Sequence, residues 1–392
     1  MKIGIIGAGP AGALCADRLA RLGVTVLLFD PRGAWEKPCG GGVTQKALLR
    51  YEFLSDCLDN RRQIRGMTVV SPGNAQVRMA LDEPLAIYSR THLNRLLLDR
   101  AVAAGALFVQ ERALDFRRQA GTWELLTERA VHALDFLIGA DGVNSFVRRK
   151  LSGRFAAEDL MITFGYRAPR DMKDVIDIKF FPKFHGYYWA FPRPNHISFG
   201  ICGRMGRHSS QALRQLLQEF MQQAGYLHDP AEANSWEVYS ALIPSLRPES
   251  FRRNRVCGDG WALVGDAAGF ADPITCEGIY YALRSGELLA EALAEHRPAD
   301  YAARCQEDFV ADFIHAAEWF KKFYAGDFLG SDFITRMVQA ASWSRSLRSI
   351  MNAFVAGRQD YRSLPASLLR RSPHIVFELA GSVFRGPVQS EI

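Results

Sequence analysis

The N-terminal segment MKIGIIGAGPAGALCADRLARLG constrains the fold of this chain more than any other stretch. Residues 2–6 form an apolar run typical of a buried strand, and residues 10–23 have the period of a helix that ends on a glycine. Between them, GAGPAG places Gly7, Gly9 and Gly12 in the spacing G-x-G-x-x-G. These glycines allow a tight turn, a close approach of backbone to a pyrophosphate, and close packing of helix on strand. The segment therefore predicts a βαβ unit that binds a dinucleotide.

The residues around the glycines support this interpretation. Free N–H groups at the start of a helix point at phosphates, and Pro10, which has no N–H, is well tolerated there beside Ala11. Asp30 ends the next strand, VTVLLFD, where its carboxylate can accept hydrogen bonds from ribose hydroxyls. A purely structural glycine turn is the alternative, and the strand, helix and acid together favour dinucleotide binding. This motif alone does not distinguish FAD from NAD.

Composition and charge exclude several classes of protein. A chain of 392 residues is expected to fold into two or three packed units, and 48% hydrophobic with 23% charged residues is ordinary for a soluble globular protein. The net charge of +6 is small, and no basic tract is interleaved with aromatic residues, so we expect no binding to nucleic acid. Two short arginine-rich stretches, at 251–255 and 368–374, could contact acidic head groups, although short charge runs are usually solvated.

Cysteine spacing bears on metal binding and on location. The seven cysteines, one of them Cys57, form neither a C-x-x-C nor a C-x-x-H pattern, which indicates no zinc site, no other metal and no disulfide framework. We expect a cytoplasmic protein in a reducing setting. Because no stretch approaches the ~20 uncharged apolar residues of a membrane span, the protein is expected to be soluble, or at most peripheral to a membrane.

The pattern along the chain changes in character twice. Helices alternate with strands at first, whereas residues 160–205 contain strands without intervening helices, which indicates a separate antiparallel sheet. Everything after residue 300 has helical periodicity. The predicted fold class is α/β, with a Rossmann-type domain built from separated segments, an α+β domain with an antiparallel sheet, and a helical C-terminal region. The predicted boundaries are 1–65, 85–155 and 255–298 for the first domain, 66–84 and 156–254 for the second, and 299–392 for the helical region.

Two later segments add signals to the first motif. FLIGADGVNSFVRR is an apolar strand that ends in Asp141 and Gly142, and WALVGDAAGFADPITCEG is a strand that ends in Gly265 and Asp266. An aspartate beside a glycine at a strand end is also a common turn, so each segment alone is equally consistent with a structural role. Helix N–H groups near residue 278 could stabilise the negative charge of a reduced flavin.

The three motifs in this order resemble the flavoprotein family of aromatic hydroxylases and geranylgeranyl reductases. The resemblance implies non-covalently bound FAD, with Asp266 at the ribitol chain, Asp141 near the pyrophosphate and Arg90 at the phosphate region. Cys276 stands where reductases of this family often have glycine. The full set of predicted cofactor residues is Gly7, Gly9, Pro10, Ala11, Gly12, Asp30, Gly40, Gly41, Arg90, Asp141, Gly142, Asp266, Gly269 and Gly278.

Two further stretches resemble the reductase branch of that family. One is KPCGGGV at 37–43, where the glycines would let backbone approach a flat ring and Cys39 is the only ionisable side chain among them. Cys39 is a candidate proton donor, or a small packing residue as most cysteines are. The other is YYWAFP at 187–192, in which Tyr187, Trp189 and Phe191 share one face of a strand. That face is either core or the wall of an apolar substrate tunnel, and Tyr187 is a second candidate acid.

Three functions agree with these features. The favoured one is an FAD-dependent reductase of carbon–carbon double bonds in an isoprenoid or other hydrophobic substrate, with hydride from reduced flavin. An oxygen-using monooxygenase or halogenase is the first alternative, because YYWAFP resembles the Trp-x-Trp-x-Ile-Pro stretch of flavin halogenases, although Tyr187 replaces its first tryptophan. The third is a flavin-binding electron carrier that docks on a membrane partner. Because no second G-x-G-x-x-G exists, NAD(P)H would bind only transiently, or a redox protein would donate the electrons.

Overall fold

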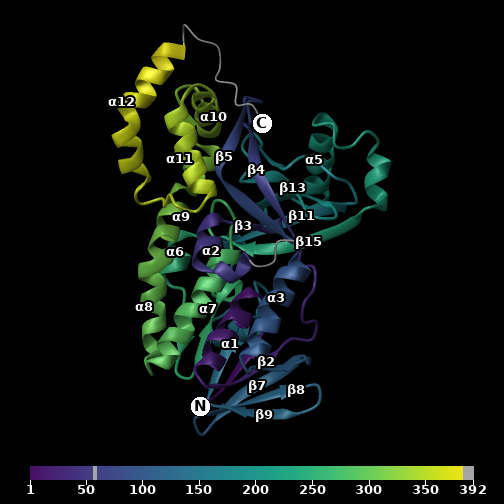
Figure 1. Cartoon of the computed structure of the whole chain (residues 1–392), viewed down its shortest axis with the longest axis vertical. Helices are drawn as coiled ribbons and strands as arrows, with labels where there is room; N and C mark the ends of the chain where they lie inside the picture. Colours follow the sequence, from purple (N-terminus) through teal and green to yellow (C-terminus); the bar gives the residue numbers. More distant parts are fainter. Residues whose placement is uncertain (56–59, 383–392) are drawn as a thin grey trace. The chain divides into compact units, whose positions relative to one another are not determined.

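The computed structural model describes residues 1–55 and 60–382, so Cys57 and the end of the predicted C-terminal region lie outside the described residues. The chain divides into two compact units (Figure 1). The first unit contains Met1–Lys37, Arg90–Leu160 and Leu242–Ile314, and the second contains Pro38–Ser89, Met161–Ala241 and His315–Ile392.

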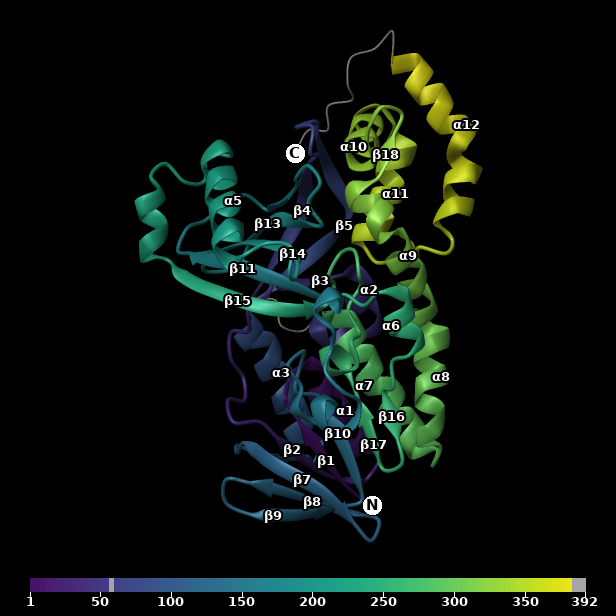
Figure 2. The same cartoon turned by 180° about the vertical axis from the view of Figure 1, so that it is seen from behind.

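The first unit is built on a six-stranded sheet in the order β16-β17-β10-β1-β2-β6. All neighbouring strands are parallel except β16 with β17. The strands are β1 (Lys2–Ile6), β2 (Thr25–Phe29), β6 (Leu107–Val109), β10 (Phe136–Gly139), β16 (Cys257–Gly258) and β17 (Trp261–Leu263). The central strands are almost fully buried, because helices cover the sheet on one side and a small antiparallel sheet packs against β1 and β10 (Figure 2). A Rossmann-type sheet assembled from separated segments is thus confirmed.

Helix α1 (Pro10–Arg21) lies against both α7 (Ile279–Ala294) and α3 (Arg90–Ala103). Gly286 of α7 makes this packing possible, because a Cβ atom there would overlap the carbonyl oxygen of Ala11. A three-stranded antiparallel sheet of β7 (Ala113–Gln119), β8 (Thr122–Thr127) and β9 (Val131–Leu134) also belongs to this unit. Its shorter helices are α4 (Phe146–Leu151), α6 (Pro248–Arg252) and α8 (Tyr301–Cys305).

The second unit contains an eight-stranded sheet in the order β15-β11-β14-β13-β12-β4-β5-β3. From β11 to β3 the pairs are antiparallel apart from β12 with β4, so the predicted antiparallel sheet is confirmed with one parallel pair. The strands are β3 (Gly42–Val43), β4 (Arg61–Val70), β5 (Gln76–Tyr88), β11 (Leu160–Ala168), β12 (Val175–Phe180), β13 (Gly186–Pro192), β14 (Ile197–Arg204) and β15 (Glu237–Pro244). A turn around residues 71–74 joins β4 to β5.

The two faces of this sheet pack differently. On one face, helix α5 (Ser210–Gln223) covers a core that includes Tyr188 and Ala190 of β13. The opposite face carries the side chains of Tyr187 and Trp189, because neighbouring residues of a strand point to opposite sides. The predicted sharing of one face by Tyr187, Trp189 and Phe191 agrees with this register.

The chain after residue 300 is helical, as predicted, with one small exception. A helix of successive segments runs from α8 through a π-helical turn (Gln306–Val310) into α9 (Ala311–Ala325). The exception is a short hairpin of β18 (Asp327–Phe328) and β19 (Ser331–Asp332). In the second unit, α10 (Phe333–Trp343) and α11 (Arg345–Val355) pack on β5, and α12 (Leu364–Ser382) packs on α10 and α11 (Figure 1). Within the part of the chain that the structure describes, we find no helix with the length and apolar character needed to cross a membrane.

The division into units differs from the predicted boundaries at several places. Residues 242–254, predicted for the second domain, belong to the first unit, and the limits near residues 85–89 and 156–160 shift by about five residues. Residues 38–65 belong to the second unit, because β3 and β4 pair with β5 in its sheet. The helices after residue 299 do not form a unit of their own. Those up to Ile314 belong to the first unit, and those from His315 on belong to the second, where they cover β5.

Candidate functional site

The three glycine- and aspartate-containing motifs meet at one edge of the sheet in the first unit. β2, β1, β10 and β17 are parallel neighbours, so their carboxyl ends lie side by side. Each strand is followed at once by one of the predicted segments: Asp30, Gly7, Asp141 and Asp266. Two contacts join the segments directly. A Cβ atom on Gly7 would overlap the carbonyl oxygen of Ala140, and one on Gly265 would lie 3.0 Å from Ala11.

The turn after β1 has the geometry that its glycines predict. Gly7 has a φ of +107°, and a Cβ atom on Gly12 would overlap the carbonyl oxygen of Gly7. Gly9 differs from both, because a Cβ atom there would meet no heavy atom within 4 Å. Gly9 is also the N-cap of α1, and Pro10 is its first residue. The open space over Gly9, at a helix N-terminus, suits the approach of a phosphate.

Asp30 shapes the turn that follows β2. Its carboxylate accepts N–H groups of Ala8 at 3.0 Å, Arg32 at 2.8 Å and Gly33 at 3.0 Å. It thereby connects the first turn to the end of the second strand. A carboxylate has about four acceptor positions, so one remains for a ribose hydroxyl. That role of Asp30 stays a prediction.

Arg90 begins α3 and is almost fully buried. One terminal nitrogen donates to Asn94 at 3.3 Å, whereas its Nε atom is buried without a partner among the described residues. Glu36 accepts the backbone N–H groups of Arg90 at 3.0 Å and Thr91 at 2.9 Å, which fixes the start of the helix. A buried N–H of a guanidinium without an acceptor is costly, so the arginine is suited to a polar ligand.

Asp141 organises the second motif. One carboxylate oxygen accepts the hydroxyl of Ser145, and the other accepts the N–H groups of Phe146 at 2.6 Å and Val147 at 3.3 Å at the start of α4. Burial raises the pKa of this carboxyl, and the hydrogen bonds oppose that effect. The structure thus gives Asp141 a local role at a helix N-terminus. Its predicted position near a pyrophosphate stays a prediction, as does that of Gly142.

Arg148 joins the second motif to the third. Its guanidinium donates to Asn254 at 3.0 Å and to the carbonyl oxygen of Ala267 at 3.3 Å, and it lies over the ring of Phe155. Burial lowers the pKa of Arg148 to about 10. The side chain is therefore a fixed link behind the loop that carries Asp266.

Asp266 forms an ion pair with Lys37, with 2.8 Å between Nζ and Oδ2. Gly269 ends this turn with a φ of +81°. Gly278 is the N-cap of α7, and a Cβ atom there would lie 3.4 Å from the Oδ1 atom of Asp266. The aspartate, both glycines and the lysine thus surround one end of α7.

Cys276 and Glu277 lie just before the start of α7. Glu277 accepts the N–H of Tyr280 at 3.1 Å, so this acid caps the first turn of the helix. Cys276 has a φ of +59°, in the left-handed region that favours glycine. The backbone therefore keeps the conformation suited to a family glycine, although a cysteine occupies the position.

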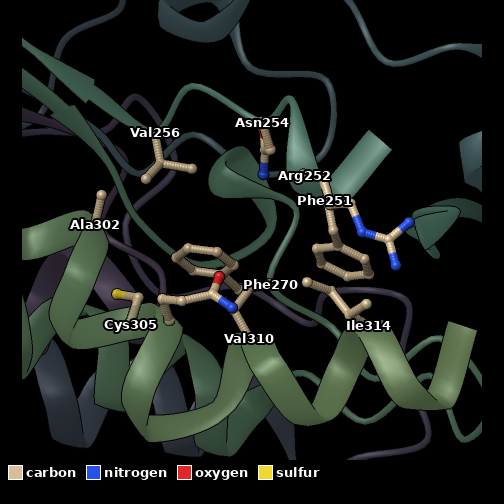
Figure 3. Close-up of a pocket in the computed structure, with 10 residues that line it drawn as sticks. Phe251, Arg252, Asn254, Val256, Phe270, Ala302, Cys305, Val310 and Ile314 are labelled. Carbon is tan, nitrogen blue, oxygen red and sulfur yellow. The ribbon is translucent and has the colours of Figure 1, made fainter. Parts of the chain in front are cut away.

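A cavity of about 330 Å³ lies in the first unit beside the π-helical turn. Figure 3 shows Cys305, Val310 and Ile314 of the helix facing Phe251 and the neighbouring segment across it. A π-turn widens a helix locally and is common at functional positions. None of the predicted cofactor residues lines this cavity. Within residues 1–55 and 60–382, no cluster of three or more His, Cys, Asp or Glu side chains could hold a metal ion.

In the second unit, the indole of Trp189 lies directly over Gly200 of the neighbouring strand, where a Cβ atom would overlap it. Its Nε1 atom is buried and has no hydrogen-bond partner in the described chain. Tyr187 and Phe191, on either side, are half-buried. At the Tyr187 end, Phe180 packs between that ring and the rings of Phe323 and Tyr324. The aromatic row is thus buried at its centre, at Trp189, and partly accessible at Tyr187 and Phe191.

The loop 38–42 is held by a buried arginine of the same unit. Arg193 is only 2% exposed, and its guanidinium donates to the carbonyl oxygens of Tyr88 and Cys39. Gly41 has a φ of +81°, and a Cβ atom there would lie 2.6 Å from both the guanidinium carbon and the Tyr88 oxygen. A Cβ atom on Gly40 would lie 2.6 Å from the ring of Phe191. Packing within the second unit therefore explains why residues 40 and 41 are glycine. Their role as cofactor contacts stays a prediction.

Cys39 itself is half-buried beside this clamp. Its sulfur accepts the N–H of Gly41 at 3.3 Å, and Ser198 lies 3.5 Å from its carbonyl oxygen. Ser198 and Tyr239 share a hydrogen bond of 2.9 Å, and the Tyr239 hydroxyl also donates to the carbonyl oxygen of Phe199. Burial raises the pKa of Tyr239 to about 12. The cysteine therefore lies next to a fixed polar network.

Several residues of these two sites were not predicted. Arg193, Ser198 and Lys37 contact predicted site residues or their loops, and Tyr239 contacts Ser198. The alternation of side chains along a strand offers a signal for Ser198. This residue lies opposite Phe191 on the neighbouring strand, so the two side chains share one face of the sheet. No comparable signal exists for Tyr239, which lies on β15, far along the chain.

We predict that alanine substitutions separate the three glycines of the loop. Gly40→Ala and Gly41→Ala should each destabilise the protein by about 1–4 kcal/mol. At position 40 the new Cβ atom would overlap the ring of Phe191. At position 41 the backbone is left-handed and the guanidinium of Arg193 lies close to the new Cβ atom. Gly42→Ala is the matched control, because its Cβ atom would make only ordinary contacts at 3.7 Å. Thermal denaturation of the three variants measures the effect. Equal losses at all three positions would contradict the packing explanation.

Comparisons with known proteins agree with the fold and the motifs. Residues 1–300 match the FAD binding domain family. A geranylgeranyl diphosphate reductase from Rhodobacter capsulatus is 30% identical over 319 residues, which cover 76% of each chain. A chloroplastic geranylgeranyl diphosphate reductase from rice is 27% identical over 324 residues, which cover 75% of this chain and 66% of the rice protein.

Solved structures share the fold over most of the chain. A geranylgeranyl bacteriochlorophyll reductase-like protein from Thermoplasma acidophilum has a TM-score of 0.75 at 20% identity and covers 97% of this chain and 98% of its own. A flavin-dependent brominase has a TM-score of 0.67 at 19% identity, with 91% and 94% covered. The match to the FAD binding domain and the 30% identity to the Rhodobacter capsulatus protein show that the chain belongs to the geranylgeranyl reductase family of FAD-dependent oxidoreductases.

Proposed function

We propose that the protein reduces carbon–carbon double bonds in an isoprenoid or other lipid-like chain. The observation that carries the proposal is the clamp between Arg193 and the loop 38–42, which joins the two stretches that resemble the reductase branch. These stretches are the cysteine–glycine loop and the aromatic strand β13, and both lie in the second unit. Relatives named as reductases of geranylgeranyl compounds support the choice of a hydrophobic substrate.

The first unit offers a set of groups that fits FAD. We propose that Gly9 and the N-terminus of α1 bind the pyrophosphate, because the space over Gly9 is open. Arg90 would donate its buried, unpartnered Nε–H to a phosphate or a nearby oxygen. Asp30 would accept from a ribose, and Asp266 from the ribitol chain. The electron donor, NAD(P)H or a redox protein, is a further part of the prediction.

The residues of the second unit would hold the alkene and supply a proton. Reduced FAD, when bound, supplies a hydride to one alkene carbon. Trp189 and Phe191 would line the apolar chain and exclude water. The proton for the other carbon would come from the Cys39 thiol, the Tyr187 hydroxyl or water. Because Gly41 already donates to the sulfur, the thiolate left after proton transfer would keep a hydrogen bond.

A test of this function is a single turnover without oxygen. FAD-loaded protein, chemically reduced under argon and mixed with geranylgeranyl diphosphate, should return to the oxidised flavin spectrum as a product heavier by two hydrogens forms. Absorbance and mass spectrometry follow the two events. If the flavin stays reduced until oxygen enters, and the product then carries an added oxygen or halogen, the protein is the oxygen-using alternative.

Asp266→Ala should lower FAD occupancy. The loss of a charge-assisted hydrogen bond costs about 1.5–3 kcal/mol, so the dissociation constant should rise by at least about tenfold. Asp259→Ala is a suitable control, because Asp259 is an exposed aspartate of the same unit that pairs with Arg118. Titration with FAD, followed by flavin fluorescence, gives both values. An unchanged affinity in Asp266→Ala would contradict the proposed contact.

Cys39→Ala should slow turnover while FAD binding stays intact. If the thiol donates the proton, product formation should fall by about 10²–10⁴, the usual contribution of a positioned acid. Cys39→Ser should keep more activity than alanine only where a hydroxyl can replace the thiol. Cys202→Ala is the control, because Cys202 is a buried cysteine on the strand next to Tyr187. Wild-type turnover in Cys39→Ala would show that the thiol only fills space.

A further inference from the structure

Helix α12 presents an apolar stripe to solvent. Its half-buried residues recur every three or four positions, which is the pattern of a helix with one face on its neighbours α10 and α11. The opposite face exposes large apolar side chains: Leu369 at 75%, Val376 at 64% and Phe377 at 78%. At 100° per residue, Pro373 and Ala380 belong to the same stripe, and both are exposed. Exposed apolar surface arranged in this way is typical of a docking surface.

The charges of α12 indicate which partner fits the stripe. Exposed Arg370 and His374 border it on one side. The one acidic residue of the helix, Glu378, is turned inward, where it accepts the hydroxyl of Ser344 at 2.6 Å and the N–H of Ser346 at 3.2 Å. The outer face of α12 therefore combines apolar side chains with positive charge and has no carboxylate.

A second copy of the chain fits this surface poorly. Pairing two stripes would bring Arg370 of each copy to the same interface, and the inward Glu378 could not compensate the charge. Anionic lipid head groups would compensate it, while the apolar stripe enters the boundary between head groups and acyl chains. We propose that α12 is an amphipathic helix that binds the protein to the surface of an anionic lipid bilayer.

Vesicle flotation of the FAD-loaded, full-length chain tests this proposal. The protein should bind vesicles of phosphatidylcholine with about one-third phosphatidylglycerol and bind pure phosphatidylcholine at least about fivefold more weakly. Leu369→Glu and Phe377→Glu should each reduce binding by about tenfold or more, because a charge replaces buried apolar area. Arg370→Gln should reduce it about fivefold, and only with the anionic vesicles.

Val131→Glu is the matched control, because Val131 is 62% exposed but lies on β9 in the first unit. Its binding to the anionic vesicles should equal that of the wild type. Undiminished binding by both Leu369→Glu and Phe377→Glu would overturn the proposal, as would equal binding to both kinds of vesicle. It would also be overturned if the chain ignored vesicles and formed a dimer that Phe377→Glu dissolves. Because these vesicles contain no prenyl substrate, none of these outcomes bears on the proposed reductase reaction.

Discussion

The buried guanidinium of Arg193 is the interaction on which the second unit's candidate site depends. It donates to two backbone carbonyls, one at the end of β5 and one in the loop 38–42. A buried charge is costly unless it is hydrogen-bonded, and here fixed backbone carbonyl oxygens accept from both terminal nitrogens. The Arg193 side chain also leaves no room for a side chain at Gly41, because a Cβ atom there would overlap the guanidinium. One arginine thus fixes the loop, the strand end and β13 to each other.

Contacts around Arg193 connect the two stretches that resemble the reductase branch, the cysteine–glycine loop and the aromatic strand β13. The cysteine–glycine loop lies some 150 residues before the aromatic strand, yet Gly40 packs on Phe191 and Cys39 binds Arg193. Trp189 in turn is placed by Gly200 on the adjacent strand. A planar guanidinium with several donors can reach two carbonyls at once, whereas a lysine offers a single charged centre. The proposed proton donor and the proposed substrate wall are therefore parts of one rigid arrangement.

Much of this was predictable from the sequence, for identifiable reasons. Gly7, Gly9 and Gly12 follow a strand and open a helix, and Asp141 and Asp266 end strands that prove to be its parallel neighbours. Period two correctly separated Tyr187 and Trp189 from Tyr188. Contacts between distant segments were not predictable, since no local pattern links Lys37 to Asp266 or Glu36 to the start of α3. The placement of residues 38–65 in the second unit likewise depends on strand pairing that propensity does not specify.

The most direct test of the clamp's importance is hydrogen–deuterium exchange of the loop 38–42 in Arg193→Met, read together with turnover. Arg170→Met is the control, because Arg170 pairs with Glu232 near the surface of the same unit. Methionine has no N–H to donate to either carbonyl, so the loop amides should exchange at least about tenfold faster, and product formation should fall while FAD stays bound. Wild-type exchange in the loop together with wild-type turnover would contradict the account.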